Sequence, residues 1–377
     1  MAQVINTRSP FFIKSEYTTL ATAELKLYIY SGIKDTDKPS TPQYSIAKAE
    51  LGGSNYVVFE ISELVRDYID VNFNQERTED AYVQRIENDN GIFEQNSLLT
   101  EFSLELDGDY SSSSVWVDGD VQIFDLSGSL VHEEYFDYIA VDGYGYFNEG
   151  ANPELSRTLL QSNLDMYYLS GETIQVPVLT EDVSSVKFYN NGSLHTTRLI
   201  SSSANSSGQI AYPSTTSETD KIEVISGSTV ETINVYSDYE CKYTSYKVTF
   251  INKFGALQNI YFFKKSTQSI NTTSDSYKAS IFNTADLRYD LQEHQYRTFH
   301  KSGKESITMN TGFVSEEYNK VIKELMLSEK VWVKDGSDIL PVNVKSKSLT
   351  YKTRVNDKLI QYTMQFDYAF DKINGIR

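Results

Sequence analysis

Apolar side chains recur at every second position in many separate stretches of this chain. Leu25, Leu27 and Ile29 alternate with more polar neighbours, and Ser31-Gly32 then interrupts the run. Successive side chains of a β-strand point to opposite faces of its sheet, so this period of two predicts strands with one buried face. The same spacing is found further along, at Val176, Val178, Val186, Phe188, Ile222 and Val224. The pattern predicts a mainly β protein.

Two places have the sequence of a β-hairpin. Asp118-Gly119 stands between the valine-rich runs 115–117 and 121–123, and glycine accepts the positive φ that a tight turn needs. Near the end of the chain, residues 349–353 and 359–370 predict two strands joined at Asn356-Asp357. The second of these strands is expected to bury one face, formed by Ile360, Tyr362, Met364, Phe366 and Tyr368.

Two short segments have helical spacing instead. Ser62 is a suitable N-cap for a helix over residues 63–69, whose apolar residues fall on one side. Glu316 and Glu317 favour a helix N-terminus, and an apolar stripe follows until Ser328. That stripe consists of Tyr318, Val321, Ile322, Leu325 and Met326. Both helices are too short for a coiled coil and are expected to pack on sheets.

The length of 377 residues suggests two or three domains, at roughly 150 residues each. We expect two or three β-sandwich-like or α+β domains with a few short helices packed on sheets. Residues 1–155 would form an acidic β-rich domain with one short helix, and residues 156–237 a Ser/Thr-rich β domain. Residues 238–377 would form an α+β domain ending in a β-hairpin. The Ser/Thr-rich segment 201–219 reads as long loops within a β domain.

The chain is acidic, with a formal charge of −18, yet its 28 Tyr and 19 Phe are typical of a folded protein rather than a disordered acidic one. An acidic chain is poorly suited to hold nucleic acid by its phosphates. Residues 1–236 carry 13 basic and 36 acidic groups, a net of −23, and residues 237–377 carry 21 and 16, a net of +5. This asymmetry fits either an acidic domain beside a near-neutral one or head-to-tail self-assembly of copies.

No motif for catalysis or cofactor binding stands out. The single Cys241 excludes an intrachain disulfide and a cysteine-based zinc site, and His132, His195, His294 and His300 lack zinc-binding spacing. The acids Asp107, Asp109, Asp118 and Asp120 resemble calcium ligands, but the spacing of a calcium loop is absent, so turns are the favoured interpretation. We therefore expect no enzyme activity, no cofactor and no metal.

Sorting signals are also lacking in the sequence as given. Its first residues, MAQVINTRSPFF, have no apolar secretory stretch, and about 18 consecutive apolar residues occur nowhere. We expect synthesis in a reducing cytoplasm and no membrane insertion.

Aromatic residues are dense in residues 135–147, and tyrosine buries a large area at little entropic cost. Most are expected in strands and core. We take Tyr144, Tyr146 and Phe147 as candidate interface residues. The terminal hairpin is a second candidate interface, by strand addition, with Tyr351, Lys352 and Arg354 as its contact residues, although Lys352 and Arg354 could equally block pairing.

Three stretches resemble virion structural proteins of tailed bacteriophages, particularly tail or baseplate proteins of phages that infect Bacteroidetes-type hosts. They cover about a third of the chain: NTRSPFFIK with LKLYIYSG, then YKVTFINKFGALQNIYFFKK, and then residues 304–370 with SEEYNKVIKELMLSEKVWV, LPVNVKSKSLTYKT and LIQYTMQFDYAF. The resemblance implies a non-enzymatic, β-rich subunit that is synthesised in the host cytoplasm and arranged symmetrically in a virion.

The expected function is therefore a structural subunit of the tail, baseplate or neck. Its expected partners are copies of itself, in a ring or trimer, and other virion tail or baseplate proteins. The alternative is a β-sandwich module that binds a host-surface glycan or protein, as a tail fibre does. Oligomeric state discriminates between them, because only the module permits a stable monomer with a small ligand.

Overall fold

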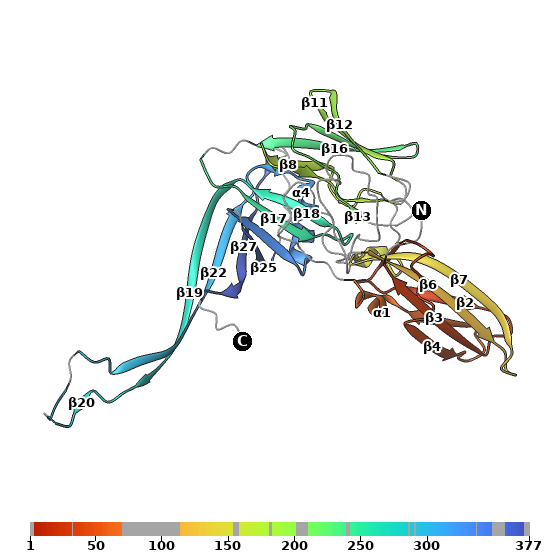
Figure 1. Cartoon of the computed structure of the whole chain (residues 1–377), viewed down its shortest axis with the longest axis horizontal. Helices are drawn as coiled ribbons and strands as arrows, with labels where there is room; N and C mark the ends of the chain where they lie inside the picture. The colour runs from red at the N-terminus through yellow and green to blue at the C-terminus, as the bar shows by residue number, and fades with distance from the viewer. Residues whose placement is uncertain are drawn as a thin grey trace. The chain divides into compact units, whose positions relative to one another are not determined.

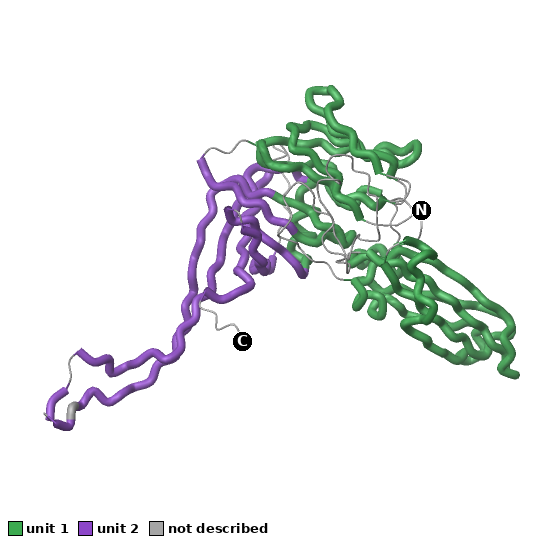
Figure 2. The backbone as a smooth tube through the Cα atoms, viewed as in Figure 1, with its two compact units in different colours: residues 1–239, 250–260, 317–328 green, residues 240–249, 261–316, 329–377 purple. Residues whose placement is uncertain are grey.

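The computed structural model describes residues 4–31, 33–69, 114–153, 158–180, 183–200, 210–238, 242–285, 287–289, 292–336, 338–348 and 359–372. Strands account for 56% and helices for 6%, in several separate sheets (Figure 1). This confirms the prediction of a mainly β protein with β-sandwich-like domains and few helices. The chain forms two compact units (Figure 2). Unit 1 contains residues 1–239, 250–260 and 317–328, and unit 2 contains residues 240–249, 261–316 and 329–377.

The first sheet of unit 1 has the strand order β1-β7-β6-β3-β4. Its strands are β1 (Val4–Asn6), β3 (Thr22–Tyr30), β4 (Tyr44–Ala49), β6 (Ser114–Phe124) and β7 (Leu130–Val141). The predicted alternation in β3 is confirmed, because Leu25, Leu27 and Ile29 are buried. Their face shares one core with the paired strands β2 (Phe12–Glu16) and β5 (Tyr56–Glu60) and with helix α1 (Ser62–Arg66). Ser62 is the first residue of α1 rather than its cap, which is Ile61.

Asp118-Gly119 lies inside β6, so the hairpin predicted at this dipeptide is wrong. Gly119 pairs with Phe136 of β7, and a Cβ at position 119 would overlap the Phe136 ring. Asp118 is buried, accepts a hydrogen bond from the Tyr30 hydroxyl at 3.2 Å and pairs with Lys38 at 2.9 Å. The turn between β6 and β7 falls further on, where Asp125 accepts hydrogen bonds from backbone N–H groups of residues 127 and 129. Glycine at 119 is thus needed for close packing.

The second sheet of unit 1 has the order β12-β11-β15-β16-β8. Its strands are β8 (Asp165–Leu169), β11 (Ser185–Asn190), β12 (Ser193–Leu199), β15 (Lys221–Ser226) and β16 (Thr229–Asp238). Two short pairs accompany it, formed by β9 (Ile174–Gln175) with β14 (Ser214–Thr215) and β10 (Val178–Leu179) with β13 (Ile210–Ala211). The alternation predicted over residues 176–224 is confirmed, because all six of its apolar residues are buried.

Unit 1 also contains two pieces from late in the chain. Helix α4 (Tyr318–Leu327) confirms the second predicted helix, with Tyr318, Val321, Ile322 and Leu325 buried. The Tyr318 ring meets Tyr167 of β8 edge-on at 5.4 Å. Asn252 donates a hydrogen bond to the Leu160 carbonyl at 2.6 Å. Three separate stretches of sequence therefore build one compact unit.

The largest sheet has the order β18-β17-β24-β25-β27-β22-β19. Its strands are β17 (Tyr246–Ile251), β18 (Leu257–Phe262), β19 (Lys264–Lys278), β22 (Tyr296–Asn310), β24 (Val331–Asp335), β25 (Asp338–Val344) and β27 (Thr363–Asp371). Two short pairs belong to unit 2: β20 (Phe282–Asn283) with β21 (Arg288–Tyr289), and β23 (Val314–Ser315) with β26 (Leu359–Ile360). The predicted apolar face of residues 360–368 is confirmed, because all five of its side chains are buried.

The terminal hairpin is described only in part. Its first strand, with Tyr351, Lys352 and Arg354, lies outside the described residues. The second strand includes β27, which pairs with β22 along one edge and with β25 along the other. Residues 366–368 of β27 are flanked by paired strands on both sides, so a further strand cannot add at that stretch. Strand addition by the rest of the terminal hairpin stays a prediction.

Candidate functional site

The most prominent feature of unit 2 is a two-stranded ribbon that continues beyond the sheet. β19 and β22 pair antiparallel from Lys264↔Asn310 to Lys278↔Tyr296, whereas β27 accompanies β22 only as far as Lys304. Residues 272–303, which we call the arm, therefore extend past the neighbouring strands (Figures 1 and 2). Among the described residues, no strand pairs with the outer edge of β19. An isolated two-stranded ribbon is at best marginally stable in water. Contact with a binding partner would therefore stabilise an arm of this length.

The arm exposes large apolar side chains along its outer part. Leu287 is 75% exposed, Tyr289 71%, Phe299 68% and Tyr296 65%, and Tyr277 and Phe282 are exposed to lesser degrees. Two ring pairs form among the described residues of the arm, Tyr277 with Phe299 at 6.1 Å and Phe282 with Tyr289 at 5.9 Å between centroids. Clustered exposed apolar groups are unusual on monomeric proteins and mark interaction surfaces.

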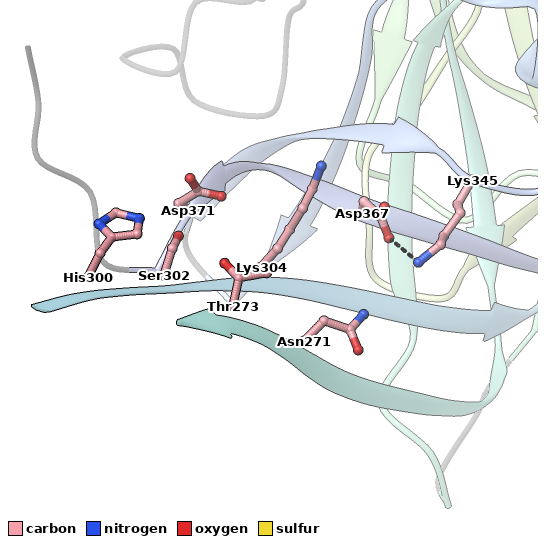
Figure 3. Close-up of a pocket in the computed structure, with 8 residues that line it drawn as sticks. All are labelled: Asn271, Thr273, His300, Ser302, Lys304, Lys345, Asp367 and Asp371. Carbon is pink, nitrogen blue, oxygen red and sulfur yellow. Dashed lines mark ion pairs between the residues drawn. The ribbon is translucent and has the colours of Figure 1, made fainter. Parts of the chain in front are cut away.

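A polar groove lies at the root of the arm (Figure 3). It has a volume of about 470 Å³ and is lined by Asn271, Thr273, His300, Ser302, Lys304, Lys345, Asp367 and Asp371. Lys345 pairs with Asp367 at 3.2 Å. In Figure 3 the Lys304 side chain rises between Asp371 and Asp367. All eight residues are polar, so the groove differs in character from the aromatic outer arm.

The three predicted interface residues near residue 145 have different environments. Phe147 begins the short 3₁₀ helix η1 (Phe147–Glu149), and its ring is fully exposed, as an interface residue requires. Tyr144 is buried, and burial raises the pKa of its hydroxyl. Tyr146 is partly exposed, and its ring meets the Tyr144 ring edge-on with 5.7 Å between centroids. The Lys323 ammonium lies over the Tyr146 ring, 3.5 Å from its centroid. The structure thus places Tyr144 in the packing of unit 1 and leaves Phe147 as the accessible member.

Glu324 of α4 is a buried carboxylic acid that the sequence pattern did not single out. The Ser162 hydroxyl donates a hydrogen bond to one carboxyl oxygen, and the backbone N–H of Lys253 donates to the other at 3.4 Å. Burial raises the pKa of Glu324, while these two hydrogen bonds and the nearby Lys253 and Lys323 oppose the shift. One side chain therefore connects the three stretches of sequence that form unit 1.

Because the folded-state pKa of Glu324 is raised, its contribution to stability is fully present below the pKa of the unfolded chain. It is lost as pH rises through the folded-state pKa. We expect Glu324→Gln to reduce the change of stability with pH. Its urea midpoint of unfolding should be higher than that of wild type at pH 8 and nearly the same at pH 4. Urea unfolding at the two pH values measures this. Glu317→Gln, at an exposed position just before the same helix, is the matched control. An unchanged pH dependence in Glu324→Gln would contradict the assignment.

The candidate metal ligands are not brought together. Asp118 and Asp120 lie in β6, and Asp107 and Asp109 are outside the described residues. Within the described part of the chain, no cluster of three or more His, Cys, Asp or Glu is arranged to hold a metal ion. His195 contacts Thr219 of its own unit at 3.1 Å, whereas His300 lines the polar groove.

The sequence matches no protein-family model and no curated protein. Of the described helices, none is long and apolar enough to span a membrane. The arm and the polar groove are therefore the features on which a functional argument can rest.

Proposed function

We propose that this chain is a non-enzymatic structural subunit of a symmetric assembly in the tail, baseplate or neck of a bacteriophage virion. The observation that carries the proposal is the arm, with six large apolar side chains exposed on a two-stranded ribbon. Burying such side chains stabilises a contact by about 1.5–3 kcal/mol each when burial is complete. The arm reaches beyond its own sheet, so it is suited to contact a neighbouring subunit.

The occupant proposed for the arm is a second copy of this chain. The charge asymmetry of the sequence, −23 over residues 1–236 and +5 over residues 237–377, favours contacts between unlike parts of two copies. Such heterologous contacts close into rings where the rotation permits. The resemblance of three sequence stretches to tail and baseplate proteins supports placing this assembly in a virion.

Sedimentation of the purified full-length chain tests the assembly. We expect a ring or trimer at low salt and a shift towards smaller species at high salt, because salt screens contacts between unlike charges. A single 42.9-kDa species at every concentration and salt would overturn the proposal.

Immunogold electron microscopy of phage particles banded from a culture of the source host tests the location. Antibodies raised against the chain should label the particles at or near the tail. Intact tailed particles that remain unlabelled, although the chain is found in the same lysate, would reject a virion role.

A further inference from the structure

The polar groove is built by the register of three neighbouring strands. Asn271 of β19 pairs with Lys304 of β22, and Lys304 pairs in turn with Asp371 of β27. Directly paired residues share one face of a sheet and lie about 5 Å apart. The row therefore presents an amide, an ammonium and a carboxylate side by side. Thr273 and Ser302 form the next paired row and add two hydroxyls.

Several of these groups have unused hydrogen-bonding capacity. Lys345 and Asp367 pair with each other, but Lys304 and Asp371 have no ion-pair partner among the described residues. The two lysines and two aspartates balance in charge. A small anion in the groove would meet two carboxylates and a small cation would meet two ammonium groups, so neither is favoured. A purely apolar ligand would leave the polar groups of all eight lining residues without hydrogen-bond partners.

A neutral hydroxyl-rich ligand suits this arrangement. A hydroxyl group donates one hydrogen bond and accepts others, so adjacent hydroxyls can donate to Asp371 while they accept from Lys304. Hydrogen bonds with one charged partner are also stronger than neutral ones. From this geometry we propose that the polar groove binds a neutral saccharide. The groove shares Thr273, His300 and Ser302 with the arm, but the assembly role rests on the exposed apolar side chains further out, none of which lines the groove. A groove of about 470 Å³ has room for one or two sugar rings.

The affinity for one saccharide is expected to be weak. No Trp, Tyr or Phe side chain is among the residues that line the groove, so binding depends mainly on hydrogen bonds that replace those to water, and a dissociation constant of about 1 mM is a reasonable expectation. In an assembly with several grooves, a polymeric saccharide could engage more than one and bind more tightly.

Saturation-transfer NMR with the full-length chain tests the proposal. The probes are maltose, lactose, cellobiose and chitobiose, with inorganic phosphate as a charged comparison. We expect saturable transfer of magnetisation to at least one disaccharide. Added inorganic phosphate should leave this transfer unchanged. Lys304→Met and Asp371→Asn should each weaken binding about tenfold or more, which corresponds to about 1.4 kcal/mol. Lys301→Met is the matched control, because Lys301 pairs with Ser274 on the opposite face of the same ribbon.

Three results would overturn the proposal: no binding of any of the four disaccharides, equal binding by Lys304→Met and wild type, or competition by phosphate. Sedimentation of the same variants keeps the two proposals apart. Lys304→Met and Asp371→Asn should assemble as wild type does, because neither removes an apolar side chain of the arm.

Discussion

Replacement of residues 273–302 by an Asn-Gly turn should leave a folded chain that no longer assembles. The change joins Thr272 to Gly303, which are directly paired, and a two-residue Asn-Gly turn fits such a pair. The ladder between Lys304–Asn310 and β27 is untouched, so the sheet should remain intact. Six large exposed apolar side chains are lost with the arm.

The expected effect is large. If only three of those side chains become half buried on assembly, they contribute about 2–4.5 kcal/mol, or roughly 40- to 2,000-fold in the association constant. Analytical ultracentrifugation of the shortened and full-length chains measures the difference. Assembly of the shortened chain with unchanged affinity would show that the arm is not the contact.

A triple variant separates the apolar groups from the length of the arm. Tyr289→Ser, Tyr296→Ser and Phe299→Ser together keep the ribbon but remove three exposed rings, and should weaken assembly almost as much as deletion. Leu51→Ser with Leu126→Ser is the control, because these leucines are at least as exposed as the three arm residues but lie in loops of unit 1. A comparable loss in the control would point to a general effect of surface hydrophobicity.

Gly119→Ala should destabilise unit 1 by about 1–3 kcal/mol, the usual cost of overpacking. The added methyl would occupy the space of the Phe136 ring, and the ring would have to leave its stacked contact with Tyr138, whose centroid lies 4.9 Å away. Urea unfolding followed by tyrosine and tryptophan fluorescence measures the change.

A second substitution identifies the cause. Phe136→Leu shortens the side chain and should recover part of the stability lost in Gly119→Ala. It should not rescue Gly128→Ala, where no atom lies within 4 Å of the added Cβ and the cost comes from a φ of +79°. Full additivity of Gly119→Ala and Phe136→Leu would contradict the proposed overlap.

Local patterns in the sequence were sufficient where burial is decided within one strand or helix. The alternation at residues 25–29 and 360–368 and the stripe of α4 were predicted correctly, because each element hides one face whatever it packs against. The same reasoning placed the end of α4 to within one residue of Ser328, whereas the helix starts at Tyr318, after the two acids expected in its first turn.

Prediction failed where the role of a residue depends on a contact with a residue far away in the sequence. Asp118-Gly119 has the composition of a turn, yet the facing Phe136 ring decides the role of the glycine, and no local pattern shows that ring. Glu324 falls within an apolar stripe as an ordinary polar residue, and only the contacts with Ser162 and Lys253 account for its burial.

The candidate site was missed for a related reason. Residues 264–278 are rich in Ser, Thr and Asn and have no apolar alternation, since neither face of the arm is covered by its own unit. A strand without a buried face leaves no period-two signal. The usable hint was the spacing of aromatic residues Tyr277, Phe282, Tyr289, Tyr296 and Phe299 within an otherwise polar stretch.

The division of unit 1 among three stretches of sequence has a consequence for biosynthesis. Residues 317–328 leave the ribosome well after residues 1–239. The early part of unit 1 therefore cannot complete its packing until the helix that carries Glu324 has been synthesised. Contacts such as that between the Arg8 guanidinium and the Leu327 carbonyl, 319 positions apart, are among the last to form. The entropic cost of closing loops of this length must be met before the contacts between their ends form, which slows folding. Apolar surface that is buried in the finished unit therefore stays exposed for longer. A nascent chain of this design depends on protection from aggregation until its final segments emerge.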